Sequence, residues 1–327
     1  MTNSQELLAG LKQQAALVDQ AMRHDLAGIR SPQLGEIISH AIFQGGKRLR
    51  PLLCMLSASL LAEPPHEAMR LSLVFEYLHA ASLLHDDVID HAELRRGAKT
   101  ANAIWGASPV ILAGDFLHAH AMALASEVGG QEAMALVGRA TAAMVEAEFL
   151  QMENAFLADL SEARYFAVLD GKTAALIAAA CETGIALAGG SPEQRRALFT
   201  YGANLGLAFQ IVDDLLDYNG DPEKTGKAVG NDFQEGKMTL PLILAMTRAG
   251  TEDRALLAGW LAATPTARAG VFGEGREVIR RNQGFELARD RANELVGEAI
   301  AGLASFPKSM PRQTLEGVAR YVLERDR

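Results

Sequence analysis

Two short acidic patterns are the residues of this chain that most clearly point to chemistry. The aspartates are Asp86, Asp87 and Asp90 in the first pattern and Asp213, Asp214 and Asp217 in the second. On an α-helix of about 3.6 residues per turn, the first and third aspartate of each pattern share a face and the second lies on its flank. Carboxylates this close repel one another unless a cation compensates, and carboxylate oxygens suit Mg2+. One such pattern alone could be a solvated helix end, whereas two that face each other would bind Mg2+ bridged to a phosphate.

A short basic segment supplies the opposite charge. Residues 45–51 read Gly-Gly-Lys-Arg-Leu-Arg-Pro, without the spacing of a Walker phosphate loop. Glycines that expose backbone N–H groups at a helix start suit an anion. Lys47, Arg48 and Arg50 add to this, because arginine offers a bidentate fork and lysine a point charge. Considered alone, the segment could equally be a solvated basic turn.

The composition favours an all-α protein with a single domain over residues 1–327. Apolar residues make up 49% of the chain and aromatic residues 6%, so the core must rely on aliphatic side chains. No alternating apolar run bounded by hairpin turns predicts a strand, and helical chains of this length can share one core. The net charge of −9 and the lack of a basic block argue against nucleic acid as a partner. Local cations and bound metal can still attract an anionic ligand.

The cysteines and the amino-terminal residues predict a cytoplasmic protein. Cys54 and Cys181 lie far apart in two apolar helices, which predicts free, buried thiols. Residues 1–6 lack the basic and apolar regions of a signal peptide. No apolar run reaches the roughly 18 residues expected of a transmembrane helix.

Apolar spacing and helix-breaking residues divide the chain into helices. Predicted helices cover residues 5–23, 33–43, 48–61, a central helix ending near 90, 109–126, 131–156, 162–187 and 192–218. Residues 97–106 are expected to form a loop or a short helix. Residues 240–327 are expected to form shorter helices broken at Gly250, Pro265, Gly284 and Pro307. Residues 219–237 are rich in glycine and charge, and a loop of this length is typical of a functional lid.

Motifs in order along the chain resemble those of the trans-isoprenyl diphosphate synthases, or polyprenyl synthetases. The likeness is greatest to their long-chain bacterial branch, which includes octaprenyl diphosphate synthases. Besides the acidic and basic segments, the matching motifs are Arg95-Arg96-Gly97, Gly114-Asp115-Phe116, Gly171-Lys172-Thr173-Ala174, Phe209-Gln210, residues 230–237 and Thr239-Leu240-Pro241. The resemblance runs from about residue 30 to residue 327. It implies a helical bundle of the isoprenoid-synthase type around a deep central cleft, and a homodimeric prenyltransferase.

The resemblance also assigns roles to the charged residues. Mg2+, as three substrate-bridged ions, would be held by Asp86, Asp90 and Asp213, with Asp87, Asp214 and Asp217 as direct or supporting ligands. The allylic diphosphate would contact Arg95, Lys172, Thr173, Gln210, Lys227 and Lys237. Isopentenyl diphosphate would be held without metal by Lys47, Arg50, His79 and Arg96. Only the allylic diphosphate has to leave, so an acidic metal cage and a basic pocket can coexist in one acidic protein.

The implied mechanism needs negative potential, without a nucleophile, beside an allylic carbocation. Backbone carbonyls near Lys172, Thr173 and Gln210 could supply it, since a carbonyl oxygen can face a cation without transferring a bond. The departing diphosphate could accept the final proton. Residues 226–237 would then close as a lid that excludes water.

Product length depends on residues below the first acidic pattern. In the family, a bulky aromatic residue five positions before the first aspartate blocks the growing chain, whereas this chain has Ala81 followed by Ser82. The resemblance therefore implies a long trans product, of octaprenyl to decaprenyl length, made from a primer such as farnesyl diphosphate. Tyr77, one turn deeper, and Met144 on the mid-chain helix are candidate floors of the tunnel, although either could be ordinary core.

One departure from the family pattern lies on that mid-chain helix. Glu146-Ala147-Glu148 stands where the family often has Glu-Gly-Glu before the residue equivalent to Gln151. Alanine favours the helix over glycine, but its methyl group could narrow the space beside the cleft.

Several alternatives remain open at this point. They are a farnesyl or geranylgeranyl diphosphate synthase, a class I terpene cyclase, and a non-catalytic partner subunit of a synthase. A cyclase would not need the basic segment, and a partner subunit should have lost carboxylates or cations that are all present here. The helix over residues 109–126 is the candidate dimer interface, and product release could bring the protein close to a membrane.

Overall fold

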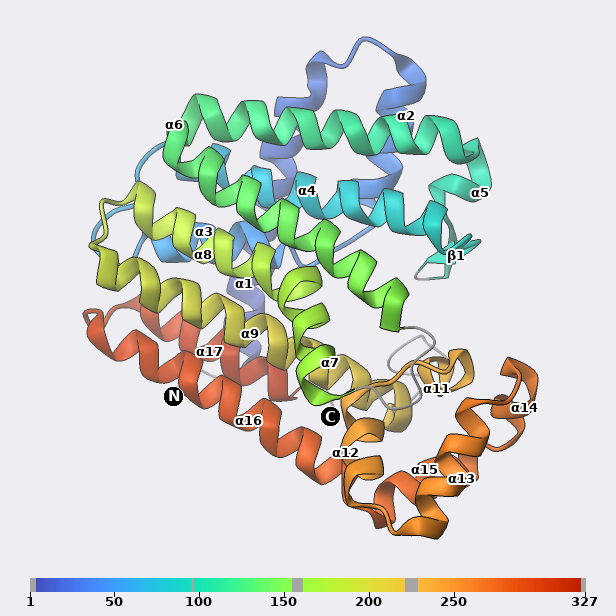
Figure 1. The fold of residues 1–327 in the computed structure, drawn as a ribbon. Helices are drawn as coiled ribbons and strands as arrows, with labels where there is room; N and C mark the ends of the chain where they lie inside the picture. The colour runs from blue at the N-terminus through green and yellow to red at the C-terminus, as the bar shows by residue number, and fades with distance from the viewer. Residues whose placement is uncertain (1–3, 96, 155–160, 221–228, 325–327) are drawn as a thin grey trace. The chain divides into compact units, whose positions relative to one another are not determined.

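The computed structural model describes residues 4–95, 97–154, 161–220 and 229–324, and the chain folds into helices joined by short loops (Figure 1). The long elements of the first half are α1 (Ser4–Asp25), α2 (Pro32–Phe43), α3 (Leu49–Ala58), α4 (Ala68–Ile89), α5 (Ala101–Trp105) and α6 (Ala107–Asn154). The second half holds α7 (Glu162–Leu169), α8 (Ala175–Leu187), α9 (Pro192–Asn219), α11 (Asn231–Glu235), α12 (Leu240–Arg248), α13 (Thr251–Leu261), α14 (Pro265–Gly270), α15 (Phe272–Arg281), α16 (Gly284–Gly302) and α17 (Met310–Glu324). Short turns are η1 (Leu26–Gly28), η2 (Asp170–Ala174) and η3 (Leu303–Ser305). Within the described ranges, no helix is both long and apolar enough to cross a membrane.

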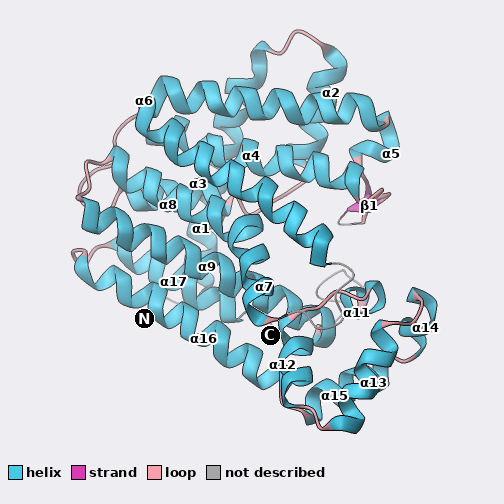
Figure 2. Ribbon diagram, viewed as in Figure 1, coloured by secondary structure: helices cyan, strands magenta, loops and turns pink. Residues whose placement is uncertain are grey.

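The all-α prediction is confirmed, with one small exception after the central helix. Figure 2 shows a two-stranded hairpin beyond α4, in which β1 (Leu94–Arg95) pairs antiparallel with β2 (Ala98–Lys99). Strands of two residues are too short to show an alternating pattern, so apolar spacing did not predict them. The short helix expected within residues 97–106 is α5.

Contacts between Cα atoms group the chain into two compact units. Unit 1 comprises Met1–Thr141, Leu176–Gly202 and Gly302–Val318, and unit 2 comprises Ala142–Ala175, Ala203–Ala301 and Ala319–Arg327. The single-domain prediction over residues 1–327 therefore stays a prediction.

Unit 1 is built around α4, which is buried along most of its length. The first arm of α6 runs beside α4 (Figure 1): Gly114 on α6 leaves no room for a Cβ next to the imidazole of His85. The break predicted at residues 129–130 is confirmed, because Gly130 has φ 63° and ψ −157°. The chain reverses direction at this glycine (Figure 1).

Small residues let the other helices of unit 1 pack closely. A Cβ on Gly184 of α8 would overlap the backbone carbonyl of Cys54 in α3, so the two backbones touch. Cys54 and Cys181 are both buried and free, as predicted. The third helix ends at Ala58 rather than at residue 61, and residues 59–61 form a turn.

Unit 2 contains a structural feature that the periodicity did not reveal. The helix predicted over residues 162–187 is interrupted by η2, a π-helical turn at Asp170–Ala174. The turn lies where Gly171 approaches its neighbour, since a Cβ there would lie 2.5 Å from the carbonyl oxygen of Ala143. π-Turns inside α-helices are rare and are frequent at functional sites.

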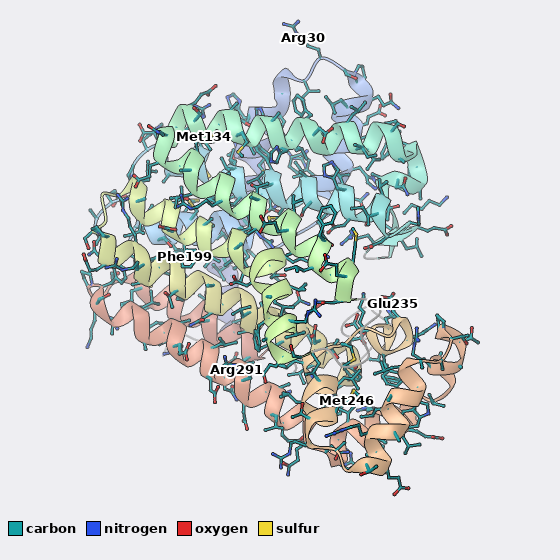
Figure 3. All side chains as sticks on the ribbon, in the orientation of Figure 1. Arg30, Met134, Phe199, Glu235, Met246 and Arg291 are labelled. Carbon is teal, nitrogen blue, oxygen red and sulfur yellow. The ribbon has the colours of Figure 1, made fainter. Side chains whose placement is uncertain are left out.

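Aromatic and cationic contacts tie the remaining helices of unit 2 together. Tyr218 at the end of α9 packs against Phe272 and Phe285, with ring centroids 6.1 and 5.5 Å away. Arg291 on α16, labelled in Figure 3, lies over the ring of Phe166 in α7 at 5.4 Å.

The helix breaks predicted after residue 240 are confirmed. Part of the irregular stretch 219–237 is helical, because residues 231–235 form α11 between two left-handed glycines.

Candidate active site

The basic loop between α2 and α3 has an unusual backbone. Gly45 and Gly46 have φ of 100° and 148°, and Arg48 has φ of 50°, a left-handed value that is rare for a residue with a side chain. A Cβ on Gly46 would lie 2.7 Å from Nη1 of Arg48, so only glycine fits beneath the guanidinium. The loop is thus shaped around the Arg48 side chain.

Arg48 anchors the loop, because its guanidinium is buried and paired with carboxylates of the protein. Its Nε donates to Asp19 at 2.6 Å, Nη1 to Glu76 at 2.8 Å, and Nη2 to the carbonyl of Ile42 at 2.7 Å. These three donor atoms of the guanidinium therefore contact residues of α1, α4 and α2, respectively. A buried cation with this many partners fixes the loop in place.

Arg50 contrasts with Arg48 two residues earlier. Its Nε is buried and has no hydrogen-bond partner within the described part of the chain. Burial lowers the pKa of the Arg50 guanidinium, against a raising effect of Glu76. A buried donor without a partner costs free energy unless a ligand satisfies it. Lys47 is exposed on the same loop.

The first acidic motif lies at the end of α4 and is partly neutralised by the protein. Asp87 is 5% exposed, and Nε and Nη2 of Arg95 both lie 2.8 Å from its Oδ1. Asp86 is half-buried, and Asp90 is exposed as the residue that caps the helix. His79 is half-buried on the same helix. The hairpin that follows the motif therefore returns a cation to its middle carboxylate.

Two further polar groups border this end of α4. The Nε2 atom of His85 lies 3.2 Å from the carbonyl oxygen of Ile111 and 3.4 Å from Asp115 on α6. These contacts link the matching Gly114-Asp115-Phe116 motif to the helix that carries the aspartates. The Asp115 carboxylate therefore lies within ion-pair distance of the His85 imidazole in unit 1.

The second acidic motif lies at the end of α9 and is neutralised differently. Asp214 is 5% exposed and accepts hydrogen bonds from the Tyr165 hydroxyl at 2.7 Å and from Gln210 Nε2 at 3.3 Å. Burial raises the pKa of Asp214 to about 7, with Asp232 and Asp213 raising it further and these two hydrogen bonds lowering it. Both of these hydrogen-bond donors, a hydroxyl and an amide, are neutral.

Asp217 extends the same acidic cluster toward α11. Its Oδ2 accepts from the backbone N–H of Asp232 at 3.0 Å. Burial, followed by the charge of Asp232, raises the pKa of Asp217 to about 6. Lys237 lies 3.3 Å from Asp232 and 2.6 Å from Glu235. Burial opposes the charged form of Lys237, but these carboxylates raise its pKa overall.

The π-turn brings the remaining predicted residues of unit 2 together. Lys172 Nζ donates to Gln151 at 3.1 Å and forms an ion pair with Glu148 on α6. Thr173 Oγ1 donates to Gln210 Oε1 at 3.4 Å. Since Gln210 in turn donates to Asp214, a hydrogen-bonded chain connects the π-turn to the second acidic motif.

The departure at Ala147 has a packing explanation. Ala147 is buried, and its Cβ lies 2.6 Å from the position that a Cβ on Gly171 would occupy. Its methyl group therefore packs against the π-turn, and the narrowing of the cleft expected from the sequence stays a prediction. The close approach is possible because the facing residue is glycine.

The residues expected to set chain length are buried in unit 1. Ala81 is buried, Ser82 donates to the carbonyl of His79 at 2.9 Å, and Tyr77 is fully buried. The Tyr77 hydroxyl donates to Asp25 at 2.9 Å, and His120 also contacts this carboxylate at 2.6 Å. Met144, the other candidate floor, is half-buried in unit 2.

The charged groups fit a metal that is shared with substrate rather than enclosed by protein. Within the described ranges, no group of three or more His, Cys, Asp or Glu side chains is arranged to hold an ion by itself. Mg2+ is usually bound by one or two carboxylates together with substrate phosphates. Burial is the main cause of the raised pKa values of Asp214 and Asp217, so a bound cation would stabilise their ionised forms, and carboxylate oxygens suit a hard divalent cation.

Some predicted residues cannot be placed, and some contacts were missed. Arg96 and Lys227 lie outside the described residues. Tyr165, Glu148 and Asp232 contact the predicted residues but were not assigned roles from the sequence. Asp232 lies in a matching motif and could have been included, whereas Tyr165 carries no sequence signal because its partner is 49 residues away.

Comparisons with known proteins agree on one family. The family model for polyprenyl synthetase matches residues 31–272. The chain is 35% identical to octaprenyl diphosphate synthase of Escherichia coli, covering 95% of this chain and 98% of that protein. It is also 35% identical to a short chain isoprenyl diphosphate synthase of Methanothermobacter thermautotrophicus, covering 98% and 99%.

Solved structures give the same result for the fold. A decaprenyl diphosphate synthase from Rhodobacter capsulatus superposes with a TM-score of 0.90 at 36% identity, over 99% of this chain and 100% of that one. A polyprenyl synthase from Caulobacter crescentus, complexed with calcium and isoprenyl diphosphate, gives a TM-score of 0.88 at 36% identity, over 99% and 98%. The predicted fold class is therefore confirmed.

Proposed function

We propose that this protein, a prenyltransferase that belongs to the polyprenyl synthetase family, makes a long trans product. It would do so by adding isopentenyl diphosphate units to an allylic diphosphate. Names of similar proteins support the length, since they include octaprenyl and decaprenyl diphosphate synthases. Ala81 and Ser82 support it too, because neither is a bulky aromatic residue below the first acidic motif. Farnesyl diphosphate is the proposed primer.

The observation that carries this proposal is the buried Nε donor of Arg50, in a protein whose net charge is −9. Its buried Nε has no partner among the described residues, and Lys47 is exposed on the same loop. A second anion is expected there, apart from the one served by the aspartates. A condensing enzyme needs two diphosphates, whereas a terpene cyclase needs one. Lys47, Arg50, His79 and Arg96 are the residues proposed to hold isopentenyl diphosphate.

The family depends on divalent metal, and we propose that Mg2+ is bound by Asp86, Asp90 and Asp213, with support from Asp87, Asp214 and Asp217. Bound there, Mg2+ would supply Lewis-acid stabilisation of the leaving diphosphate. Arg95, Lys172, Lys227 and Lys237 are proposed to bind the same diphosphate. Arg95, Lys172 and Lys237 each pair with a carboxylate, so binding of the diphosphate would require them to exchange these partners for phosphate oxygens.

The π-turn is the proposed source of negative potential for the carbocation. A π-turn moves backbone N–H groups to more distant carbonyls and leaves a carbonyl without its usual helical partner. Residues 170–174 contain Lys172 and Thr173, and Thr173 is hydrogen-bonded to Gln210. Carbonyl oxygens at this turn can stabilise a cation without reacting with it. The departing diphosphate is the proposed acceptor of the final proton.

Labelled isopentenyl diphosphate with farnesyl diphosphate and Mg2+ tests the proposal directly. Chromatographic sizing of the products should show octaprenyl to decaprenyl chains, and chelation of divalent metal should abolish incorporation. A product of fifteen or twenty carbons would instead identify a short-chain synthase. A hydrocarbon from farnesyl diphosphate alone would identify a cyclase, and no turnover with any primer would indicate a partner subunit.

The chain-length argument has its own test in Ala81→Phe. Ala81 is buried one helical turn above Tyr77, so a phenyl ring there should block elongation and shorten the product sharply. Ser59→Ala, far along the chain in the turn after α3, is a control that should leave the product unchanged. Unaltered product length in Ala81→Phe would contradict the proposed path of the growing chain.

We also propose a homodimer. The first arm of α6, the predicted interface, exposes Ile111 and Leu112, and Leu112 is 66% exposed. Ile104 in the preceding α5 is exposed as well. Apolar side chains gathered in this way are typical of protein interfaces. Sedimentation velocity of the full chain would distinguish a dimer from a monomer.

A further inference from the structure

His40 connects the basic loop to the hairpin that follows the first acidic motif. It lies in the last turn of α2, from which the chain leads directly into the loop of Lys47 and Arg50. Its Nε2 lies 2.9 Å from the carbonyl oxygen of Lys99 in β2. The partner strand β1 carries Arg95. One imidazole thus spans two segments that are 59 residues apart in the sequence and that both carry proposed diphosphate ligands.

The surroundings of His40 fix both its tautomer and its orientation. A carbonyl oxygen only accepts hydrogen bonds, so Nε2 must carry the proton and Nδ1 must be an acceptor. The side-chain nitrogen of Gln44, which can donate, lies 2.6 Å from Nδ1 and 3.1 Å from Nε2, so its shorter contact is with the acceptor nitrogen. Trp105 of α5 packs edge-on against the imidazole, with ring centroids 5.2 Å apart. The ring therefore contacts the Lys99 carbonyl, the Gln44 amide and the Trp105 ring.

The hairpin depends on such anchors because it is too short to be stable alone. Each of its strands has two residues, and an isolated two-stranded hairpin is marginal even when longer. Arg95 ties one strand to Asp87, and Thr100 donates to the carbonyl of Ala92 at 2.6 Å. Both of these contacts hold the hairpin to the segment just before it. The His40 contact instead holds it to the last turn of α2, from which the chain leads into the basic loop.

The basic loop is held from the other side by Arg48. Its ion pairs with Asp19 and Glu76 fix the loop against α1 and α4. With Arg48 on one side and His40 on the other, both the position of the loop and its distance to the hairpin are determined by protein contacts. Condensation requires the two substrates to meet within a narrow range of separations, so this distance matters for the reaction.

We propose that His40 is a positioning residue that sets the spacing between the Lys47 and Arg50 loop and the Arg95 hairpin, and through it the affinity for isopentenyl diphosphate. The inference rests on the proposed function. Loss of the His40 hydrogen bond frees the loop and the β2 end of the hairpin from each other. Arg95 keeps its two bonds to Asp87, so the allylic side is less affected.

Three variants of the full chain test this. His40→Ala removes the contact, and His40→Gln retains an N–H donor at similar reach for the Lys99 carbonyl. His66→Ala changes an exposed histidine in the loop before α4 and serves as the matched control. For each protein, the KM values of both substrates and kcat are measured with Mg2+, together with the Tm. Calorimetric titration of isopentenyl diphosphate into the metal-free protein gives a Kd that does not depend on turnover.

The expected result for His40→Ala is a rise of roughly five- to tenfold in the KM and Kd for isopentenyl diphosphate, the size of one lost hydrogen bond. Its kcat and the KM of the allylic substrate should change less than about twofold, and His40→Gln should recover most of the affinity. The inference is overturned if His40→Ala binds isopentenyl diphosphate normally. It is also overturned if both KM values and kcat worsen together, or if His40→Gln is no better than His40→Ala.

The same experiment separates this inference from the proposed function. If the unaltered protein fails to incorporate isopentenyl diphosphate, the proposed function fails. If the unaltered protein incorporates it and His40→Ala behaves like His66→Ala, only the role of His40 fails.

Discussion

The two acidic motifs share one spacing but differ in what neutralises them. Asp87 and Asp214 are the middle aspartates, and each is 5% exposed. Asp87 is paired with the guanidinium of Arg95, whereas Asp214 is held by a hydroxyl and an amide, both neutral. Burial raises the pKa of Asp214 to about 7. The first motif is therefore partly balanced by the protein, and the second requires a proton or a bound cation.

This difference shows that a sequence pattern can specify the positions of carboxylates without specifying their charge. Desolvation favours the neutral form of a buried acid unless a cation lies within a few ångströms. The hairpin after α4 supplies such a cation, and the segment after α9 brings another carboxylate, Asp232, instead. We expect metal binding to be coupled to proton release mainly at the second motif.

The largest predicted effect comes from removing a leading aspartate from either motif. Asp86→Asn and Asp213→Asn should each lower kcat by about a thousandfold, because several kcal/mol of charge stabilisation at the leaving diphosphate is lost. Steady-state kinetics at saturating Mg2+ measures this. Glu127→Gln and Glu277→Gln change exposed acids in the two units and should leave kcat within about twofold. Retention of a tenth of the activity by either aspartate variant would contradict the proposed ligand set.

Substitution of the middle aspartates should change stability in opposite directions. The comparison is made in metal-free protein at pH 8. Asp87→Asn leaves Arg95 without its carboxylate partner and should lower the free energy of unfolding by about 2 kcal/mol. Full burial of the pair would give a larger loss, but solvent screens Arg95, which is partly exposed. Asp214→Asn removes an unfavourably buried charge and should raise the free energy of unfolding by about 1–2 kcal/mol. The Gln210 amide can turn to accept from the new Asn side chain.

Urea unfolding with a chelator present measures both changes. Asn substitution keeps the size of each side chain, so packing differences should be small. A parallel Asp253→Asn variant shows the effect of losing a half-buried carboxylate that pairs with Arg281. If the two middle aspartates respond with the same sign, the electrostatic distinction between the motifs is wrong.

The sequence predicted the elements that carry the site better than the contacts within it. Helix periodicity and glycine or proline breaks located α2, α4 and α9 closely, because these helices have long apolar faces. The π-turn at residues 170–174 was missed, since inserting one residue in a turn hardly changes apolar spacing. The hairpin was missed because its strands have two residues each.

Charge pairing was the other limit of the sequence. Residues 47, 48 and 50 appear as three equivalent cations, yet Arg48 points into the protein and holds Asp19 and Glu76. These partners lie 29 and 28 residues away, so nothing local distinguishes Arg48 from Arg50. Tyr165 reaches Asp214 across a similar gap. Such contacts follow from tertiary packing, which a single sequence does not display.

The comparison also predicts how stability should depend on pH without metal. The pKa of Asp214 is about 7 in the folded protein, above its ordinary value of 3.8, so the folded state binds the proton more tightly than the unfolded state. Its contribution is present below about pH 4 and is lost as pH rises to about 7, a loss of roughly 4 kcal/mol for a pKa raised from 3.8 to about 7. Asp217, with a pKa of about 6, adds to the loss in the same direction.

Unfolding of the metal-free protein in urea at several values between pH 5 and pH 8 tests this dependence. The difference between Asp214→Asn and the unaltered protein should be small at pH 5 and largest at pH 8. The matched Asp87→Asn difference should not grow in that window. A difference for Asp214→Asn that is constant with pH would mean that this carboxylate is already ionised at pH 5.

The smallest predicted effect concerns the hydroxyl that holds Asp214. The Tyr165 hydroxyl donates to Asp214 at 2.7 Å and thereby lowers the pKa of that carboxyl. Tyr165→Phe should raise the pKa of Asp214, by somewhat less than one unit for a bond worth about 1 kcal/mol. Metal binding at the second motif needs the ionised carboxylate. The Mg2+ concentration for half-maximal turnover should therefore rise severalfold in Tyr165→Phe near pH 7. Near pH 9 it should equal that of the unaltered protein.

Tyr201→Phe is the matched control, because that buried hydroxyl donates to the carbonyl of Leu315 in unit 1. It should lose stability without changing the pH dependence of the Mg2+ requirement, and an equal shift in both variants would show that the Tyr165 hydroxyl does not act through Asp214.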